Sequence, residues 1–131
     1  MRIWIIVGII AAISITGGIY FGTAAQQVTS QTILETDKTI IDQEIQYPSG
    51  KPLVTSSIVT IPVGAETGFH THEYPMYAYI LEGKVTVDYG EEGLKTYVKG
   101  DTFIEAINYE HNGKNTGEEP AKILVVLMGE Q

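Results

Sequence analysis

Short apolar segments separated by turn residues fill the chain after residue 26, and they constrain its fold more than any other feature. In one of them, Val85, Val87 and Tyr89 alternate with polar neighbours, which is typical of a strand with one buried face. No segment there shows the period of a long amphipathic helix. Strands are expected at 39–46, 53–61, 76–81, 84–89, 94–98, 102–107 and 122–128. This spacing predicts an all-β domain, either a small barrel or a jelly roll.

The N-terminal segment has a different character. Arg2 is followed by an uncharged run at 3–25, which is long enough to span a bilayer core of about 30 Å. Ala24 and Ala25 also offer a small-residue cleavage site, and a buried core helix is the alternative. Residues 1–25 are therefore expected to be an apolar helix that acts as a signal peptide or an N-terminal membrane anchor. Because Arg2 marks the inner side, residues 26–131 are expected to form an exported domain, periplasmic or extracellular.

Composition excludes several classes of site and partner. The chain has no cysteine, which rules out disulfides, iron–sulfur clusters and thiolate zinc sites. From residue 26 onward seven lysines stand against sixteen acidic residues, a net charge of 7 − 16 = −9. A field of this sign disfavours nucleic acid and anionic lipid as partners. Contact with a membrane is expected only through the N-terminal segment, and a small molecule remains the expected ligand.

All three histidines of the chain fall in two spaced groups. His70 and His72 are two residues apart, so a strand would point both rings off the same face. His111, from a distant strand, could complete a set of three imidazoles around one ion. Imidazole favours transition metals over calcium or magnesium, so a divalent Fe, Mn, Ni, Cu or Zn ion is the expected cofactor. A barrel without metal, in which the histidines only form hydrogen bonds, is the alternative.

The residues around these histidines resemble the two paired motifs of the cupin superfamily. The first motif reads Gly64, five residues, His70-x-His72, three residues, Met76, six residues and Gly83. The second reads Gly100, five residues, Ala106-x-Asn108, two residues, His111, three residues and Asn115. The resemblance implies a double-stranded β-helix, also called a jelly-roll barrel, with a metal held inside it by His70, His72 and His111. By analogy, Asn115 fixes the strand that carries His111.

Met76 is the most important departure from the family pattern. It replaces a glutamate that in the family usually supplies a fourth metal ligand, whereas Ala106 and Asn108 are mild replacements of a proline and a glycine. The expected centre therefore has three uncharged ligands. Glu105 interrupts the otherwise apolar segment 103–107, which makes it a candidate acid/base or partner of the centre. A carboxylate on the solvent side of an edge strand is the alternative interpretation of Glu105.

The resemblance implies a metal-binding cupin that acts on a small organic molecule at the three-histidine centre, and the N-terminal segment implies that this cupin is exported. Dioxygenase-type oxidation is the most natural chemistry, followed by isomerisation or decarboxylation. A non-catalytic cupin that binds a small ligand or a metal is the alternative, and the loss of the glutamate favours it. Tyr77 and Tyr79 are expected on the face opposite the histidines, where they would fill the space between sheets or line the homodimer interface that the family often forms.

Overall fold

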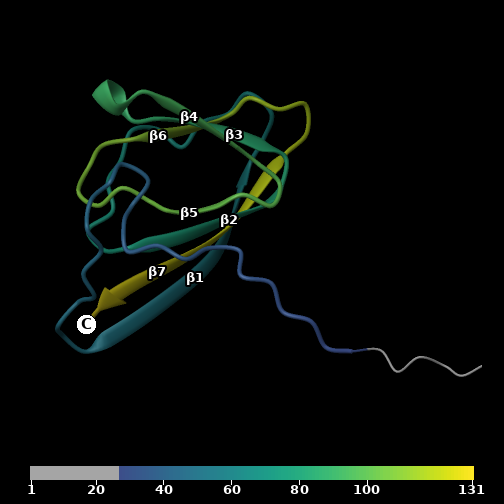
Figure 1. Cartoon of the computed structure of the whole chain (residues 1–131). Helices are drawn as coiled ribbons and strands as arrows, with labels where there is room; N and C mark the ends of the chain where they lie inside the picture. The colour runs from purple at the N-terminus through teal and green to yellow at the C-terminus, as the bar shows by residue number, and fades with distance from the viewer. Residues whose placement is uncertain (1–26) are drawn as a thin grey trace, which may run out of the picture. The chain divides into compact units, whose positions relative to one another are not determined.

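Two antiparallel sheets lie one above the other in this computed structural model, which describes residues 27–131 (Figure 1). The described part contains seven strands and one short 3-10 helix. They are β1 (Pro52–Ile61), β2 (Met76–Glu82), β3 (Lys84–Asp88), η1 (Gly90–Glu92), β4 (Leu94–Val98), β5 (Thr102–Ile104), β6 (Asn112–Asn115) and β7 (Ala121–Glu130). One sheet has the order β1-β7-β2-β5 and the other has the order β4-β3-β6. Residues 31–131 form one compact unit.

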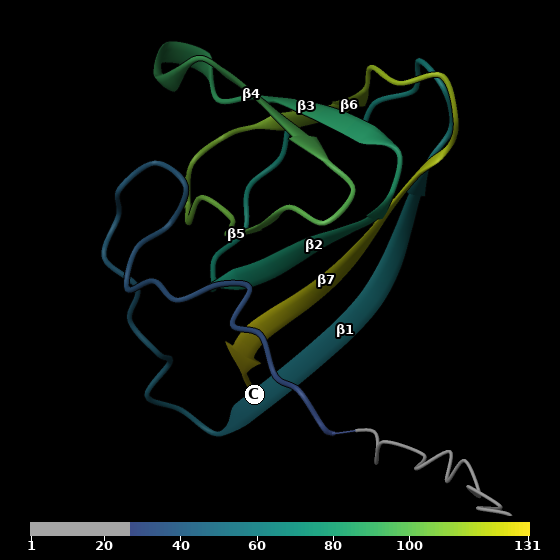
Figure 2. The same ribbon diagram turned by 45° about the vertical axis from the view of Figure 1, so that its right-hand side comes forward.

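The architecture confirms the all-β prediction and fits a jelly-roll sandwich. The long strands β1 and β7 pair along their whole length, and β2 follows on the other side of β7 (Figure 2). The predicted signal peptide or membrane anchor at 1–25 lies outside the described residues. Within 27–131, the structure contains no helix with the length and apolar character that crossing a membrane requires.

The core lies between the two sheets. Val85, Val87 and Tyr89 are 1%, 4% and 0% exposed, so the alternation seen in the sequence does mark the inner face of β3. Ala78 and Ile80 are buried on the inner face of β2. The tyrosines at 77 and 79 alternate with them and are half-buried. Their predicted role in a homodimer stays a prediction.

Three segments differ from the predicted strands. Residues 39–46 form a turn with an isolated bridge between Lys38 and Glu44, because Asp42 adopts a positive φ of 63° that interrupts a strand. The strand predicted at 102–107 ends at Ile104. Two residues later, the Ala106 N–H donates to the Glu105 side chain and is therefore not paired with a neighbouring strand. β6 was not predicted, since its sequence is polar throughout and shows no apolar alternation.

Gly83 occupies a turn that no other residue fits. It joins β2 to β3 with a positive φ of 78°, and an added Cβ would lie 2.8 Å from the Ala121 Cα and 3.0 Å from the Pro120 carbonyl oxygen. A side chain there would combine backbone strain with a clash against main-chain atoms that cannot move aside.

Gly83→Ala is therefore expected to lower the free energy of unfolding by about 3 kcal/mol. Gly100 provides a matched control, because its φ is also positive, at 95°, but an added Cβ would meet no heavy atom within 4 Å. Gly100→Ala is expected to cost about 1 kcal/mol from backbone strain alone. Urea denaturation of both variants measures the difference, and equal costs would show that the predicted clash at Gly83 is absent.

Candidate metal centre

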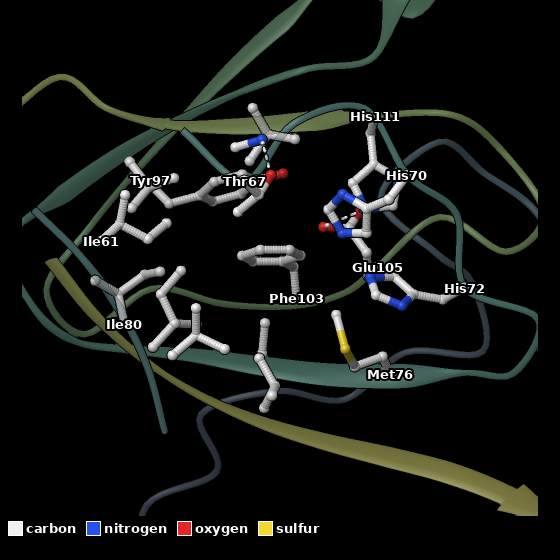
Figure 3. Close-up of a pocket in the computed structure, with 17 residues that line it drawn as sticks. Ile61, Thr67, His70, His72, Met76, Ile80, Tyr97, Phe103, Glu105 and His111 are labelled. Carbon is white, nitrogen blue, oxygen red and sulfur yellow. Dashed lines mark hydrogen bonds and ion pairs between the residues drawn. The ribbon is translucent and has the colours of Figure 1, made fainter. Parts of the chain in front are cut away.

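Three imidazoles from two distant parts of the chain converge at one end of the space between the sheets (Figure 3). One ring nitrogen from each of His70, His72 and His111 lies within 4.8 Å of the other two. The ring centroids are 4.6–5.1 Å apart. Bonds of about 2.1 Å from each nitrogen to one ion would bring the ligand nitrogens to about 3–4 Å from one another. The cluster is therefore close enough to share a single ion after small rotations of the rings.

Main-chain pairing brings the two motifs together. His70 and His111 exchange both backbone hydrogen bonds, each 3.0 Å long, as an antiparallel pair. His72 bridges to Ile107, and its carbonyl accepts a 2.7 Å bond from the Asn108 N–H. Asn108 has a φ of 49°, which Asn tolerates better than most residues. The expected regular strand through the first motif is replaced by isolated bridges, and these still aim both rings of that motif at the centre.

Hydrogen bonds at the second ring nitrogen orient two of the imidazoles. His70 Nδ1 lies 2.8 Å from the Gly68 carbonyl oxygen, and His111 Nδ1 lies 2.8 Å from the Tyr109 carbonyl oxygen. A carbonyl only accepts, so Nδ1 carries the proton in both rings and the lone pair is left on Nε2. This is the tautomer that metal binding through Nε2 requires.

His72 supplies the observation that tests whether the cluster suits a metal. Its Nε2 is buried and has no hydrogen-bond partner among the described residues. A buried polar atom without a partner is costly, and a metal ion coordinated at that nitrogen would remove the cost. Burial, followed by the proximity of His111 and His70, lowers the pKa of His72 from 6.5 to about 4. At neutral pH the ring is therefore uncharged, as a metal ligand must be.

The lowered pKa of His72 predicts how the stability of the metal-free protein depends on pH. The folded protein binds this proton more weakly than the unfolded chain. The contribution of His72 to the free energy of unfolding is therefore greatest above pH 6.5, falls as the pH decreases toward about 4, and changes no further below that pH. The free energy of unfolding, measured with a chelator present, should fall more between pH 7.5 and pH 4.5 in the wild type than in His72→Gln. An identical fall in both proteins would contradict this assignment.

Glu105 is buried beside the histidines, which overturns the alternative of a solvent-facing carboxylate. It is 5% exposed, and its Oε2 lies 3.7 Å from His111 Nε2. Its Oε1 accepts two hydrogen bonds of 2.8 Å, one from the Tyr89 hydroxyl and one from the Ala106 N–H. The Tyr89 hydroxyl also lies 3.3 Å from the Tyr97 hydroxyl. A chain of buried polar groups thus leads from the core to the histidine cluster.

The two tyrosines of this chain were not predicted as part of the site. Burial raises the pKa of both Tyr89 and Tyr97 above the usual range, and the nearby Glu105 raises it further. Both hydroxyls therefore stay protonated and can donate. The inward alternation of β3 placed Tyr89 in the core, but nothing in the sequence indicated that its hydroxyl would meet Glu105.

A cavity of about 160 Å³ opens behind the imidazoles (Figure 3). Phe103 and Met76 lie on its walls near the histidines. The other lining residues come from both sheets, and most are aliphatic: Val59, Ile61, Thr67, Ala78, Ile80, Val85, Val87, Tyr97, Gly113, Ile123 and Val125, with Glu105 and the three histidines. No lysine or arginine is among these described lining residues. The site therefore combines a polar end and an apolar interior.

Known proteins share this architecture. The family model of the cupin domain matches residues 57–127, which is more than half of the chain. A protein from Bacillus halodurans has a TM-score of 0.54 and 20% identity, with 60% of this chain and 64% of that chain covered. The cupin domain of Schizosaccharomyces pombe Cnp3 has a TM-score of 0.52 and 22% identity, covering 59% and 56%. An oxalate oxidase has a TM-score of 0.52 and 20% identity, covering 58% and 42%.

This chain thus spans less than two thirds of the length of each of these three proteins. Identities of this size establish the shared fold. No curated protein matches the chain. The matched range 57–127 contains all three histidines, Glu105 and both motif glycines that open the histidine motifs. Together with the two-sheet sandwich and the family match, these observations place the chain in the cupin superfamily.

Proposed function

We propose that this domain holds a divalent transition metal at His70, His72 and His111 and binds a small, mainly apolar organic molecule through that metal. The observation that carries the proposal is the convergence of three imidazoles at the mouth of an apolar cavity. The unpartnered Nε2 of His72 supports the metal. Fe, Mn, Ni, Cu and Zn can all bind to imidazole ligands, so the three histidines do not select one of these metals. Metal analysis of the purified protein identifies the ion.

The cavity limits the size of the ligand. Its volume of about 160 Å³ is close to that of an engineered apolar cavity of about 150 Å³ that binds benzene. One aromatic ring or a short branched chain would fill this space. Phe103 and the surrounding aliphatic side chains would exclude water from such a ligand and orient it toward the histidines.

The cavity also limits the charge of the ligand. With no lysine or arginine on its described walls, a second carboxylate or a phosphate would be buried without a partner. A dianion such as oxalate therefore fits this cavity poorly, although an oxalate oxidase shares the fold. A catechol or a 1,3-diketone fits better, because its oxygens can bind a metal while the remainder stays in apolar surroundings.

A bound metal would polarise ligand oxygens and would support dioxygen chemistry on such a chelated molecule. We therefore propose dioxygenase-type oxidation as the leading reaction class. The competing proposal is a non-catalytic binder, and the presence of Met76 at the family's glutamate position favours it, since a thioether cannot transfer a proton. Both proposals use the same three histidines.

Metal-loaded protein and a panel of ligands separate these proposals. We expect a catechol or a small 1,3-diketone to bind only when metal is present, with oxalate as the charge control and a flavonol as the size control. Oxygen consumption with any of the small ligands would support the dioxygenase. Metal-dependent binding without oxygen consumption would support the binder. Failure of every small ligand to bind the metal-loaded protein would contradict both.

Export is a separate proposal that rests on residues 1–25 alone. Fused to a reporter enzyme that is active only outside the cytoplasm, residues 1–30 should produce activity in cells. The same fusion with two arginines inserted in the middle of the apolar run should not, because charges there prevent membrane insertion. Equal activity from both fusions would contradict the proposal.

A further inference from the structure

This chain lacks the glutamate that the cupin motif places at position 76, and a different carboxylate lies beside its histidines. We propose that Glu105, whose N–H donates a 2.9 Å hydrogen bond to the Met76 carbonyl, supplies the negative charge of the metal centre from the position beside Met76. This inference rests on the metal centre proposed above. It adds a residue from the second motif to a centre whose three imidazoles carry no charge.

Proximity is the first support for this role. Glu105 Oε2 lies 3.7 Å from His111 Nε2, the ring nitrogen left free by the bond between His111 Nδ1 and the Tyr109 carbonyl. His111 is 2% exposed, so both groups are shielded from water. Glu105 also lines the cavity that the histidines close (Figure 3). Its free oxygen therefore lies next to the point at which an ion would be held.

The carboxylate is fixed in this position. Its Oε1 accepts hydrogen bonds from the Tyr89 hydroxyl and the Ala106 N–H, and Tyr89 is itself fully buried. These bonds engage one carboxylate oxygen and leave Oε2 available toward the centre. A side chain held at two points loses little further freedom when it acts there.

Charge balance is the second support. A buried carboxylate is costly unless a cation compensates it. Among the described residues, His111 is the one basic side chain within 4.0 Å of Glu105, and the other groups bonded to the carboxylate are uncharged donors. A divalent cation on the three imidazoles would provide the missing positive charge. The same carboxylate would in turn lower the excess charge that uncharged ligands leave on the metal.

Nearby carboxylates do not have this placement. Glu73 follows His72 and Glu110 precedes His111 in the sequence, but both side chains are exposed and neither lines the cavity. Glu110 is therefore a matched control, because it adjoins a proposed ligand and carries the same charge.

The test compares Glu105→Gln with Glu110→Gln in the full folded domain. Glutamine keeps an oxygen that can accept from Tyr89 and Ala106 but removes the charge. We expect Glu105→Gln to weaken Zn²⁺ and Co²⁺ binding by about 10–100-fold, measured by competition with a chromophoric chelator. Azide should bind more tightly to Co²⁺-loaded Glu105→Gln than to the wild type, because the centre becomes more positive. Glu110→Gln should change neither quantity.

A rescue variant separates charge from packing. The double variant Met76→Glu/Glu105→Gln returns a carboxylate to position 76, the main-chain neighbour of residue 105, and we expect it to regain most of the lost metal affinity. If circular dichroism shows that Glu105→Gln does not fold, Tyr89→Phe tests the role of Glu105 instead. This substitution removes one of the hydrogen bonds that hold the carboxylate, so it should also weaken metal binding.

The outcomes distinguish this inference from the proposed function. A wild type that binds no metal would overturn both. A wild type that binds metal, together with unchanged metal and azide affinities in Glu105→Gln, would overturn the role of Glu105 alone. Unchanged metal affinity in Tyr89→Phe would overturn it equally if the glutamine variant is unfolded.

Discussion

Replacing His111 with alanine is expected to weaken metal binding on the order of 10³-fold. Binding energies of about 10–16 kcal/mol for structural zinc, shared among three or four ligands, correspond to roughly 4 kcal/mol for each one. His111 Nε2 is one of the three converging nitrogens, and the chain has no fourth histidine and no cysteine to replace it. The backbone pairing of His70 with His111 uses main-chain atoms and should survive the substitution.

Isothermal titration with Zn²⁺ measures this effect. The wild type should bind one equivalent per chain, and His111→Ala should bind it far more weakly while retaining the circular dichroism spectrum of a β protein. Glu110→Gln, which changes the exposed neighbour of His111, should match the wild type. Equal affinity in the wild type and His111→Ala would show that His111 is not a ligand.

Asn115→Ala is expected to lower the free energy of unfolding by about 3–4 kcal/mol. Asn115 is 1% exposed, and its Nδ2 donates to the carbonyl oxygens of Ile61 and Glu119, each at 2.8 Å. Its Oδ1 accepts from the Gly117 N–H, also at 2.8 Å. One side chain thus joins the end of β1, β6 and the turn before β7. Its removal would leave buried main-chain groups without partners, which costs about 1–3 kcal/mol for each such group.

Urea denaturation of Asn115→Ala and Asn112→Ala measures this difference. Asn112 lies on the same strand, but its side chain bonds only to the exposed side chains of Glu66 and Thr67, so we expect a loss below about 1 kcal/mol. Equal losses in the two variants would mean that the buried hydrogen bonds of Asn115 contribute no more than the surface contacts of Asn112.

The parts of the fold that follow from local pattern could be predicted from the sequence. The alternation of Val85, Val87 and Tyr89 identified a strand and its inner face, because burial on one side of a sheet imposes a period of two. The spacing of the histidines predicted that they would converge, and their ring nitrogens lie within 4.8 Å of one another. The first prediction uses one short stretch of the chain, whereas the second joins distant residues and relies on the resemblance of the two histidine motifs to the cupin pattern.

Features that depend on long-range contacts could not be predicted in this way. β6 has a polar sequence and exists because it pairs with β3. The burial of Glu105 depends on Tyr89, which is sixteen residues away and donates to it from the position directly after β3. The sequence shows that Glu105 interrupts an apolar segment, where a buried carboxylate would need hydrogen-bond donors. Only the packed structure shows that buried donors beside the histidines provide these bonds.

X-ray absorption spectroscopy of the Zn²⁺-loaded protein tests the central claim most directly. The account predicts that three imidazoles coordinate one ion, with nitrogen at about 2.0–2.1 Å and the outer-ring scattering typical of histidine. His111→Ala, loaded at high zinc concentration, should lose one imidazole from that signal. A wild-type spectrum with oxygen ligands only, or with the same number of imidazoles as His111→Ala, would contradict the three-histidine centre.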